Sequence, residues 1–110
     1  DSRAALVGLL SAWGCEVQCA EDLISTQQCL AGGFHPEVVL ADLRLAGGAS
    51  GIEAVIAVRD WLGKPLPALI VTGDVGDARA QRAEAVGLNV LPKPVKPMQL
   101  RAFLGQAFGA

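Results

Sequence analysis

Three polar residues stand directly after three apolar stretches of the sequence, and together they could handle a phosphoryl group. Asp42 ends the run "VVLAD", Thr72 ends "ALIVT", and Lys93 follows "NVLP". A carboxylate can act as a nucleophile toward phosphorus, while an ammonium and a hydroxyl can bind the phosphoryl oxygens. Each residue alone is common in turns and at strand ends, so the argument depends on their conjunction.

These side chains can meet only if the three apolar stretches form neighbouring parallel strands. The stretches 38–41 and 68–71 are apolar without alternation, which is typical of strands that helices cover on both faces. In an open parallel sheet, ligands gather at the carboxyl ends of the strands, where the strand order reverses. We therefore expect Asp42, Thr72 and Lys93 to converge at one edge of such a sheet.

Helix signals fill the segments between these strands. Leucines recur at helical spacing before Gly14, which ends that pattern. Asp22 is a plausible N-cap, and Ser50 with Glu53 has the spacing of a capping box. The sequence predicts helices at 3–13, 21–33, 52–63, 77–87 and 97–108, and strands at 15–20, 37–42, 68–72 and 89–92.

Strict alternation of helices and strands, with short connections, predicts a single α/β domain over residues 1–110. The last helix begins at Pro97 and is expected to turn Leu100, Leu104, Ala107 and Phe108 toward the core. The pattern opens with a helix, although a chain of β/α units should open with a strand. Only four strands are predicted, where five would complete a small doubly wound sheet.

Composition excludes several classes of protein. The 110 residues are 52% hydrophobic and carry a net charge of −2 without a basic cluster, which argues against direct nucleic-acid binding. No apolar run reaches the roughly 20 residues of a membrane span, and no signal peptide is visible, so we expect a cytoplasmic domain without direct membrane contact, although its parent chain could be membrane-attached. The three cysteines are interpreted as buried free thiols, and His35 as a surface loop residue.

Several of these stretches resemble one known family. "VVLADLRL", "LIVTGD" and "VLPKPVKPMQL" resemble site motifs of response-regulator receiver domains, the phosphoacceptor modules of two-component signalling, and "SRAALVGLLSAWGCEV" resembles the first helix and second strand of that family. The resemblance implies a flavodoxin-like (CheY-like) doubly wound parallel sheet of order 2-1-3-4-5, with the first strand absent from this sequence. The motifs are most similar to receivers attached to hybrid sensor histidine kinases.

The same resemblance implies roles for individual residues. Asp42 is implied as the phosphoacceptor in a phosphorelay, Thr72 as the switch hydroxyl and Lys93 as the lysine of the site, with a cis peptide bond between Lys93 and Pro94. The implied partner is a histidine kinase or a phosphotransfer domain, and a homodimer is left open. The expected role is regulatory and not enzymatic.

A divalent cation is part of what the resemblance implies, because a dianionic phosphoryl donor is repelled by a carboxylate. In the family, Mg²⁺ is held by the phosphoacceptor, by the backbone carbonyl two residues later, here that of Arg44, and by two acids at the end of the first strand. That acid pair would precede residue 1, so we expect an incomplete metal site and an N-terminally incomplete domain. Asp1 is expected near the start of the first helix and not in the metal site.

Other positions depart from the family pattern. Leu45 and Ala46 replace a usual Met-Pro pair, although the Gly-rich loop to Gly51 is expected to keep its approach to the site by bare backbone. Val90 replaces the usual aromatic switch residue, which leaves open a degenerate receiver that binds partners independently of phosphorylation. Arg44 argues against a haloacid dehalogenase-like phosphatase, which needs an acid/base aspartate at that position.

Overall fold

A three-stranded parallel sheet forms the centre of the computed structural model, which describes residues 2–108. Its strands, in spatial order, are β1 (Val39–Asp42), β2 (Ala68–Thr72) and β3 (Asn89–Pro92). Asp42 lies beside Val71, and Thr72 lies beside Pro92. Because the strands are parallel and in this register, their carboxyl ends lie at one edge of the sheet.

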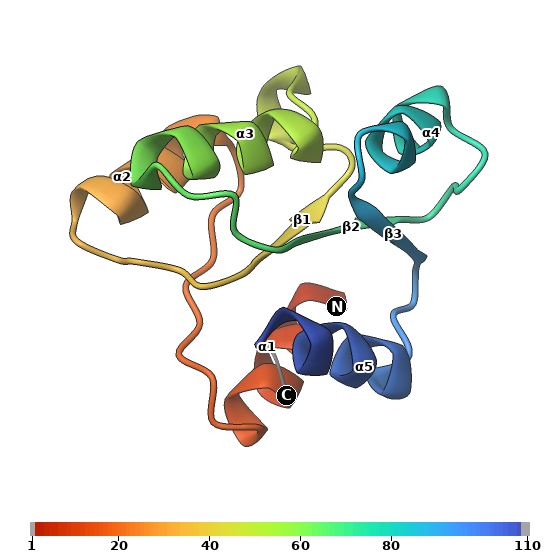
Figure 1. Cartoon of the computed structure of the whole chain (residues 1–110), viewed down its shortest axis with the longest axis horizontal. Coiled ribbons are helices and arrows are strands. Elements are labelled where there is room, and N and C mark those ends of the chain that lie inside the picture. The colour runs from red at the N-terminus through yellow and green to blue at the C-terminus, as the bar shows by residue number, and fades with distance from the viewer. Residues whose placement is uncertain (1, 109–110) are drawn as a thin grey trace.

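Helices cover both faces of this sheet. In Figure 1, α1 and α5 lie together below the strands, and α2, α3 and α4 lie above them. The layers therefore match the α/β arrangement that the alternation of helix and strand signals predicts. The helices of the described residues are α1 (Ser2–Ala12), α2 (Leu23–Ala31), α3 (Gly51–Leu62), α4 (Ala78–Ala85), α5 (Pro97–Ala107) and the short 3₁₀ helix η1 (Ala46–Gly48).

The central strand β2 joins two hydrophobic clusters. All five of its residues are buried. Ile70 packs with Val55 of α3 and with the alanines of α4, whereas Leu69 packs with Leu100 of α5 and with Leu10 of α1. Burial on both faces explains why this strand is apolar without alternation.

Capping interactions fix the starts of two helices. The backbone N–H of Ser25 donates to the Asp22 carboxylate at 2.8 Å, and the N–H of Glu53 donates to the Ser50 hydroxyl at 3.3 Å. In each case the side chain at the third helical position bonds back to the backbone of the N-cap residue, so both are complete capping boxes. The N-cap at Asp22 and the capping box at Ser50 are confirmed.

The predicted strand at 15–20 is wrong. These residues are extended but form no sheet, and Cys15 and Val17 pack against the cluster between α1 and α5 while their neighbours face outward. The alternation is therefore real, but a strand also needs a hydrogen-bonding neighbour. A cavity of about 670 Å³ lies between this segment and β1, lined by Gln18 and Ala20 on one side and Leu40 on the other. Within residues 2–108, β1 is thus an edge strand of the sheet.

Smaller differences concern single side chains. Phe108 is exposed, and Phe103 is buried in its place on α5. The three cysteines are free, as expected, but the prediction that they are buried is wrong, because Cys19 is exposed and Cys15 and Cys29 are only half-buried. His35 is exposed in a loop, as predicted.

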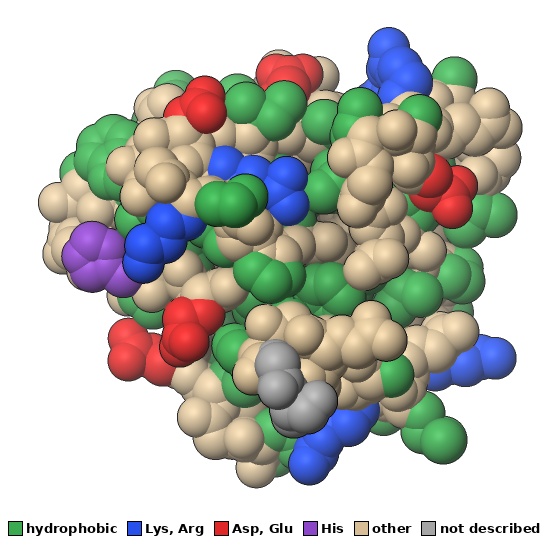
Figure 2. Space-filling model, in the orientation of Figure 1, with side chains coloured by type: hydrophobic (Ala, Val, Ile, Leu, Met, Phe, Trp, Pro, Cys, Tyr) green, Lys and Arg blue, Asp and Glu red, His purple; other side chains and the backbone are tan. Residues whose placement is uncertain are grey.

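Acidic and basic side chains are scattered over the face in Figure 2, with hydrophobic side chains across its middle. Within residues 2–108, no helix is both long and apolar enough to cross a membrane.

Candidate functional site

Asp42 and Lys93 meet across the carboxyl edge of the sheet. The Nζ of Lys93 forms an ion pair with Oδ1 of Asp42, although their strands are separated by β2. The side chain of Asp42 is 46% exposed and that of Lys93 is 34% exposed, so a group from solvent can reach both of them. The backbone N–H of Lys93 donates to the carbonyl oxygen of Thr72 at 2.8 Å, and the Lys93–Pro94 peptide bond is cis.

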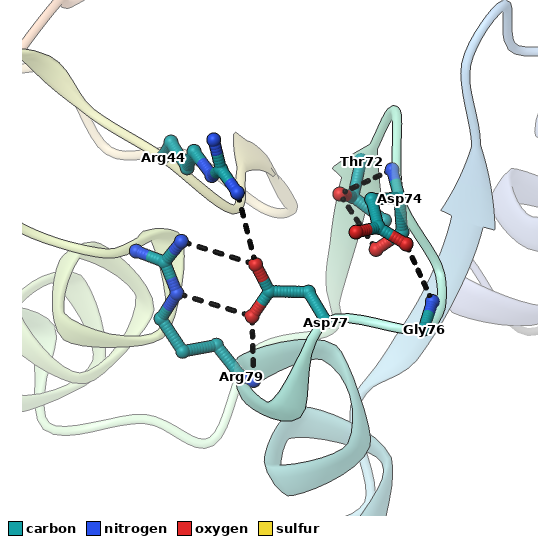
Figure 3. Close-up of polar contacts among 6 residues, drawn as sticks. All are labelled: Arg44, Thr72, Asp74, Gly76, Asp77 and Arg79. Atoms are coloured by element: carbon teal, nitrogen blue, oxygen red, sulfur yellow. Dashed lines mark hydrogen bonds and ion pairs between the residues drawn. The ribbon is translucent and has the colours of Figure 1, made fainter.

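Thr72 lies at the end of the strand between these two residues and is buried, at 6% exposure. Its hydroxyl accepts a hydrogen bond from the N–H of Asp74 at 3.1 Å and donates to the carbonyl oxygen of the same residue at 3.3 Å (Figure 3). The structure therefore places Thr72 at the shared edge but holds its hydroxyl in the loop before α4. The hydroxyl must exchange this local bond before it can bind a group on Asp42.

Gly51 approaches Asp42 with its backbone alone. The N–H of Gly51 donates to the carbonyl oxygen of Leu43 at 3.0 Å, and a Cβ atom at position 51 would overlap the carbonyl group of Asp42. Ser50, which caps α3, holds this glycine at the first position of the helix. The loop after β1 is thus closed tightly against the strand end, as the Gly-rich sequence predicts.

The backbone of Arg44 could contribute an oxygen to a metal ion. Arg44 lies opposite Ser50 in an isolated antiparallel bridge, flanked by bonds from Leu45 N–H to the Ala49 oxygen at 2.9 Å and from Gly51 to Leu43. Neither bond uses the Arg44 carbonyl oxygen. The carboxylate of Asp42 and this carbonyl are hard oxygen donors of the kind that Mg²⁺ prefers.

These two oxygens alone do not make a complete metal site. Residues 2–108 contain no group of three or more metal-binding side chains, and Lys93 already pairs with one oxygen of Asp42. Asp1 lies outside the described residues. The donor chemistry therefore fits a magnesium ion, but most of its ligands must come from elsewhere.

A cavity opens beside this edge of the sheet. It has a volume of about 670 Å³, and Asp42, Arg44 and Lys93 are among the residues that line it. The cavity continues along the unpaired edge of β1, past Val39 and Leu40. The candidate site is therefore an open one, accessible to a group carried by another molecule.

Asp77 is the residue of this region that sequence reasoning missed. It caps α4, and its carboxylate is bound by the guanidinium groups of both Arg79 and Arg44 (Figure 3). Hydrogen bonds from Arg79, and then from Arg44, hold the pKa of Asp77 well below its ordinary value. The sequence "DAR" signals an N-cap, but nothing local reveals a contact with a residue 33 positions earlier.

Neither a protein-family model nor a curated protein matches this sequence.

Solved structures do match, and they share one fold. The N-terminal domain of a response regulator/sensory box/GGDEF three-domain protein from Carboxydothermus hydrogenoformans superposes with a TM-score of 0.79 at 20% identity, over 96% of this chain and 84% of that one. The signal receiver domain of a modulated diguanylate cyclase from Desulfovibrio desulfuricans G20 gives 0.78 at 26% identity, over 94% and 82%. The chemotaxis protein CheY4 from Vibrio cholerae gives 0.75 at 27% identity, over 96% and 88%. The structural neighbours of this chain are therefore response-regulator receiver domains, and the chain shares their flavodoxin-like (CheY-like) fold.

Proposed function

We propose that this chain is the phosphoacceptor receiver domain of a two-component phosphorelay, which takes a phosphoryl group onto Asp42 and thereby regulates a partner or an attached domain. The ion pair between Asp42 and Lys93 at the carboxyl edge of the sheet carries the proposal. Thr72, on the strand between them, supplies a hydroxyl within the same edge. The likeness to solved receiver domains supports it.

The proposed donor is a phosphohistidine on a histidine kinase or a phosphotransfer domain. A carboxylate oxygen of Asp42 attacks the phosphorus and forms a P–O bond, while the P–N bond breaks and its electron pair returns to the imidazole nitrogen. Lys93 offsets the charge of the transferred group, and Thr72 donates to a phosphoryl oxygen once its hydroxyl has left Asp74. The exposure of Asp42 suits a donor that arrives on another protein.

Mg²⁺ belongs to this proposal as an expected cofactor. Asp42 and the carbonyl oxygen of Arg44 would hold it, and it would neutralise charge between the donor and the carboxylate. The ion takes about six oxygen ligands, so water or other oxygen donors would complete its coordination.

Two other functions compete with this one. An aspartate-based phosphatase is disfavoured because the residue two positions after Asp42 is an arginine, which stays protonated and cannot act as a general base. A receiver that binds partners independently of phosphorylation is favoured by Val90, a half-buried aliphatic residue on β3 that cannot turn an aromatic ring inward. The Asp42–Lys93 pair argues for the phosphorylated form, because a pure docking module has no need of it.

The decisive experiment is treatment of the protein with a small acyl phosphate and Mg²⁺, followed by intact mass measurement. We expect the wild type to gain the mass of one phosphoryl group and Asp42→Asn to gain none. Asp60→Asn is the matched control, because Asp60 is an exposed aspartate on α3, away from the carboxyl edge. Equal phosphorylation of the wild type and Asp42→Asn would remove Asp42 from its proposed role. No phosphorylation of either would favour the docking module.

A further inference from the structure

Two loops of the candidate site are joined through a single carboxylate. The Nη2 of Arg44, in the loop after β1, lies 3.2 Å from Oδ2 of Asp77, which begins α4. The Nη2 of Arg79 lies 3.1 Å from the same oxygen, and its Nε lies 3.2 Å from Oδ1. Figure 3 shows the two guanidinium groups reaching Asp77 from different parts of the chain.

The two arginines do not hold Asp77 equally. Arg79 gives two side-chain bonds and also donates its backbone N–H at 2.8 Å, as part of the cap of α4. Arg44 gives one bond, and its side chain is 72% exposed. Exposed ion pairs with a single bond are among the weakest interactions in proteins. Arg44 can therefore leave Asp77 at little cost, because Arg79 keeps the carboxylate paired.

Arg44 is also close to the nucleophile. It follows Asp42 by two residues, and both side chains are exposed, whereas Leu43 between them is buried. Both line the same cavity of about 670 Å³, together with Lys93. A guanidinium also presents several N–H donors in a plane, which suits phosphoryl oxygens.

We propose that Arg44 is a second cationic ligand of the phosphoryl group on Asp42, held on Asp77 until that group arrives. A phosphoryl group carries a charge of about −2 and several strong acceptor oxygens, whereas the carboxylate of Asp77 is already neutralised by Arg79. The arrival of the phosphoryl group therefore transfers Arg44 from Asp77 to Asp42. Phosphorylation then releases the loop after β1 from the start of α4. This inference rests on the proposed function.

Affinity for beryllofluoride, a mimic of the phosphoryl group, tests the transfer, measured by fluorine NMR in the presence of Mg²⁺. Arg44→Gln should weaken binding by roughly five- to tenfold, because a charged hydrogen-bond donor is lost. Asp77→Asn should strengthen binding by up to about fivefold, because the competing ion pair is gone while asparagine keeps the helix cap. In the Arg44→Gln background, Asp77→Asn should have no further effect.

Two further variants sharpen the comparison. Arg79→Gln breaks the Asp77–Arg79 pair, as Asp77→Asn does, but it leaves the Asp77 carboxylate in place with Arg44 as its remaining partner. It should therefore weaken binding, whereas Asp77→Asn strengthens it. Arg82→Gln, which removes a positive charge from the last turn of α4, should change the affinity by less than about twofold because exposed charges are screened. Hydrogen exchange of residues 73–79 should rise on binding in the wild type and already be high in free Arg44→Gln.

The possible failures can be told apart. Wild-type affinity in Arg44→Gln, or additive effects of Arg44→Gln and Asp77→Asn, would overturn the role of Arg44 while leaving the proposed function intact. Equal binding to wild type and Asp42→Asn, or none to either, would overturn the proposed function and this inference with it.

Discussion

At the carboxyl edge of the sheet, Asp42 and Lys93 offset each other's charge while both stay open to solvent. An exposed pair of this kind contributes little to folding, typically about 0–1 kcal/mol. In the proposed function its value would be chemical, because the ammonium already lies where negative charge would be added to Asp42. Thr72 differs, since its hydroxyl is buried and committed to Asp74. A response of Thr72 would therefore also alter the loop that leads to α4.

The backbone contact at Gly51 gives the first prediction at the scale of single residues. In Gly51→Ala the new methyl group overlaps the carbonyl of Asp42, a rigid backbone group that cannot turn aside. We expect a loss of roughly 1–3 kcal/mol in the free energy of unfolding, larger than the gain of up to about 1 kcal/mol that alanine brings to a helix.

Gly8→Ala is the matched control for this substitution. Gly8 lies within α1, and a Cβ there meets nothing within 4 Å. Alanine should therefore stabilise the protein by about 0.5–1 kcal/mol. Denaturant unfolding measures both changes, and a stabilised Gly51→Ala variant would show that the loop is not packed against Asp42.

At the scale of elements, the strands at 68–72 and 89–92 were predictable to the residue, as were the caps at Asp22 and Ser50, because their signals are local. The segment 15–20 was not. Its alternation describes which side chains face inward, but a strand also depends on a neighbour that sequence spacing cannot place. The Arg44–Asp77 contact could not be predicted from the sequence for the same reason, since it joins two loops that only the folded sheet brings together.

The start of α4 gives a prediction of pH dependence. The pKa of Asp77 lies below its ordinary value of 3.8 because Arg79, and then Arg44, bind the ionised form. A lowered folded-state pKa adds stability above the unfolded-state value, and this stability is lost as the pH falls below it. The difference in unfolding free energy between wild type and Asp77→Asn should therefore be constant from pH 7 to about pH 5 and shrink below about pH 4.

Arg79→Gln tests the cause of this dependence. Arg79 is the main cause of the lowered pKa of Asp77. Its removal should therefore reduce the loss of unfolding free energy between pH 5 and pH 3. Chemical denaturation at a series of pH values measures it. An unchanged pH profile in Arg79→Gln would mean that another group stabilises the ionised form.

For the whole molecule, the layers decide where chemistry can occur. Helices cover both faces of the sheet (Figure 1), so the strand ends and the edge strands β1 and β3 are where polar side chains can reach it. Both the candidate site and the 670 Å³ cavity lie there. The sequence predicts this placement because uniformly apolar strands imply covered faces.

The central strand links the two layers into one folding unit, and this can be tested from both faces. Leu69 and Ile70 have no exposed surface and belong to opposite clusters, so Leu69→Ala and Ile70→Ala should each cost roughly 2–5 kcal/mol. Because both clusters share β2, each variant should still unfold in a single transition, followed by circular dichroism and tryptophan fluorescence. Ile56→Ala, at a residue 52% exposed on α3, should cost less than about 1 kcal/mol. Separate transitions for the two probes would mean that unfolding is not a single step, and that β2 does not join the layers into one folding unit.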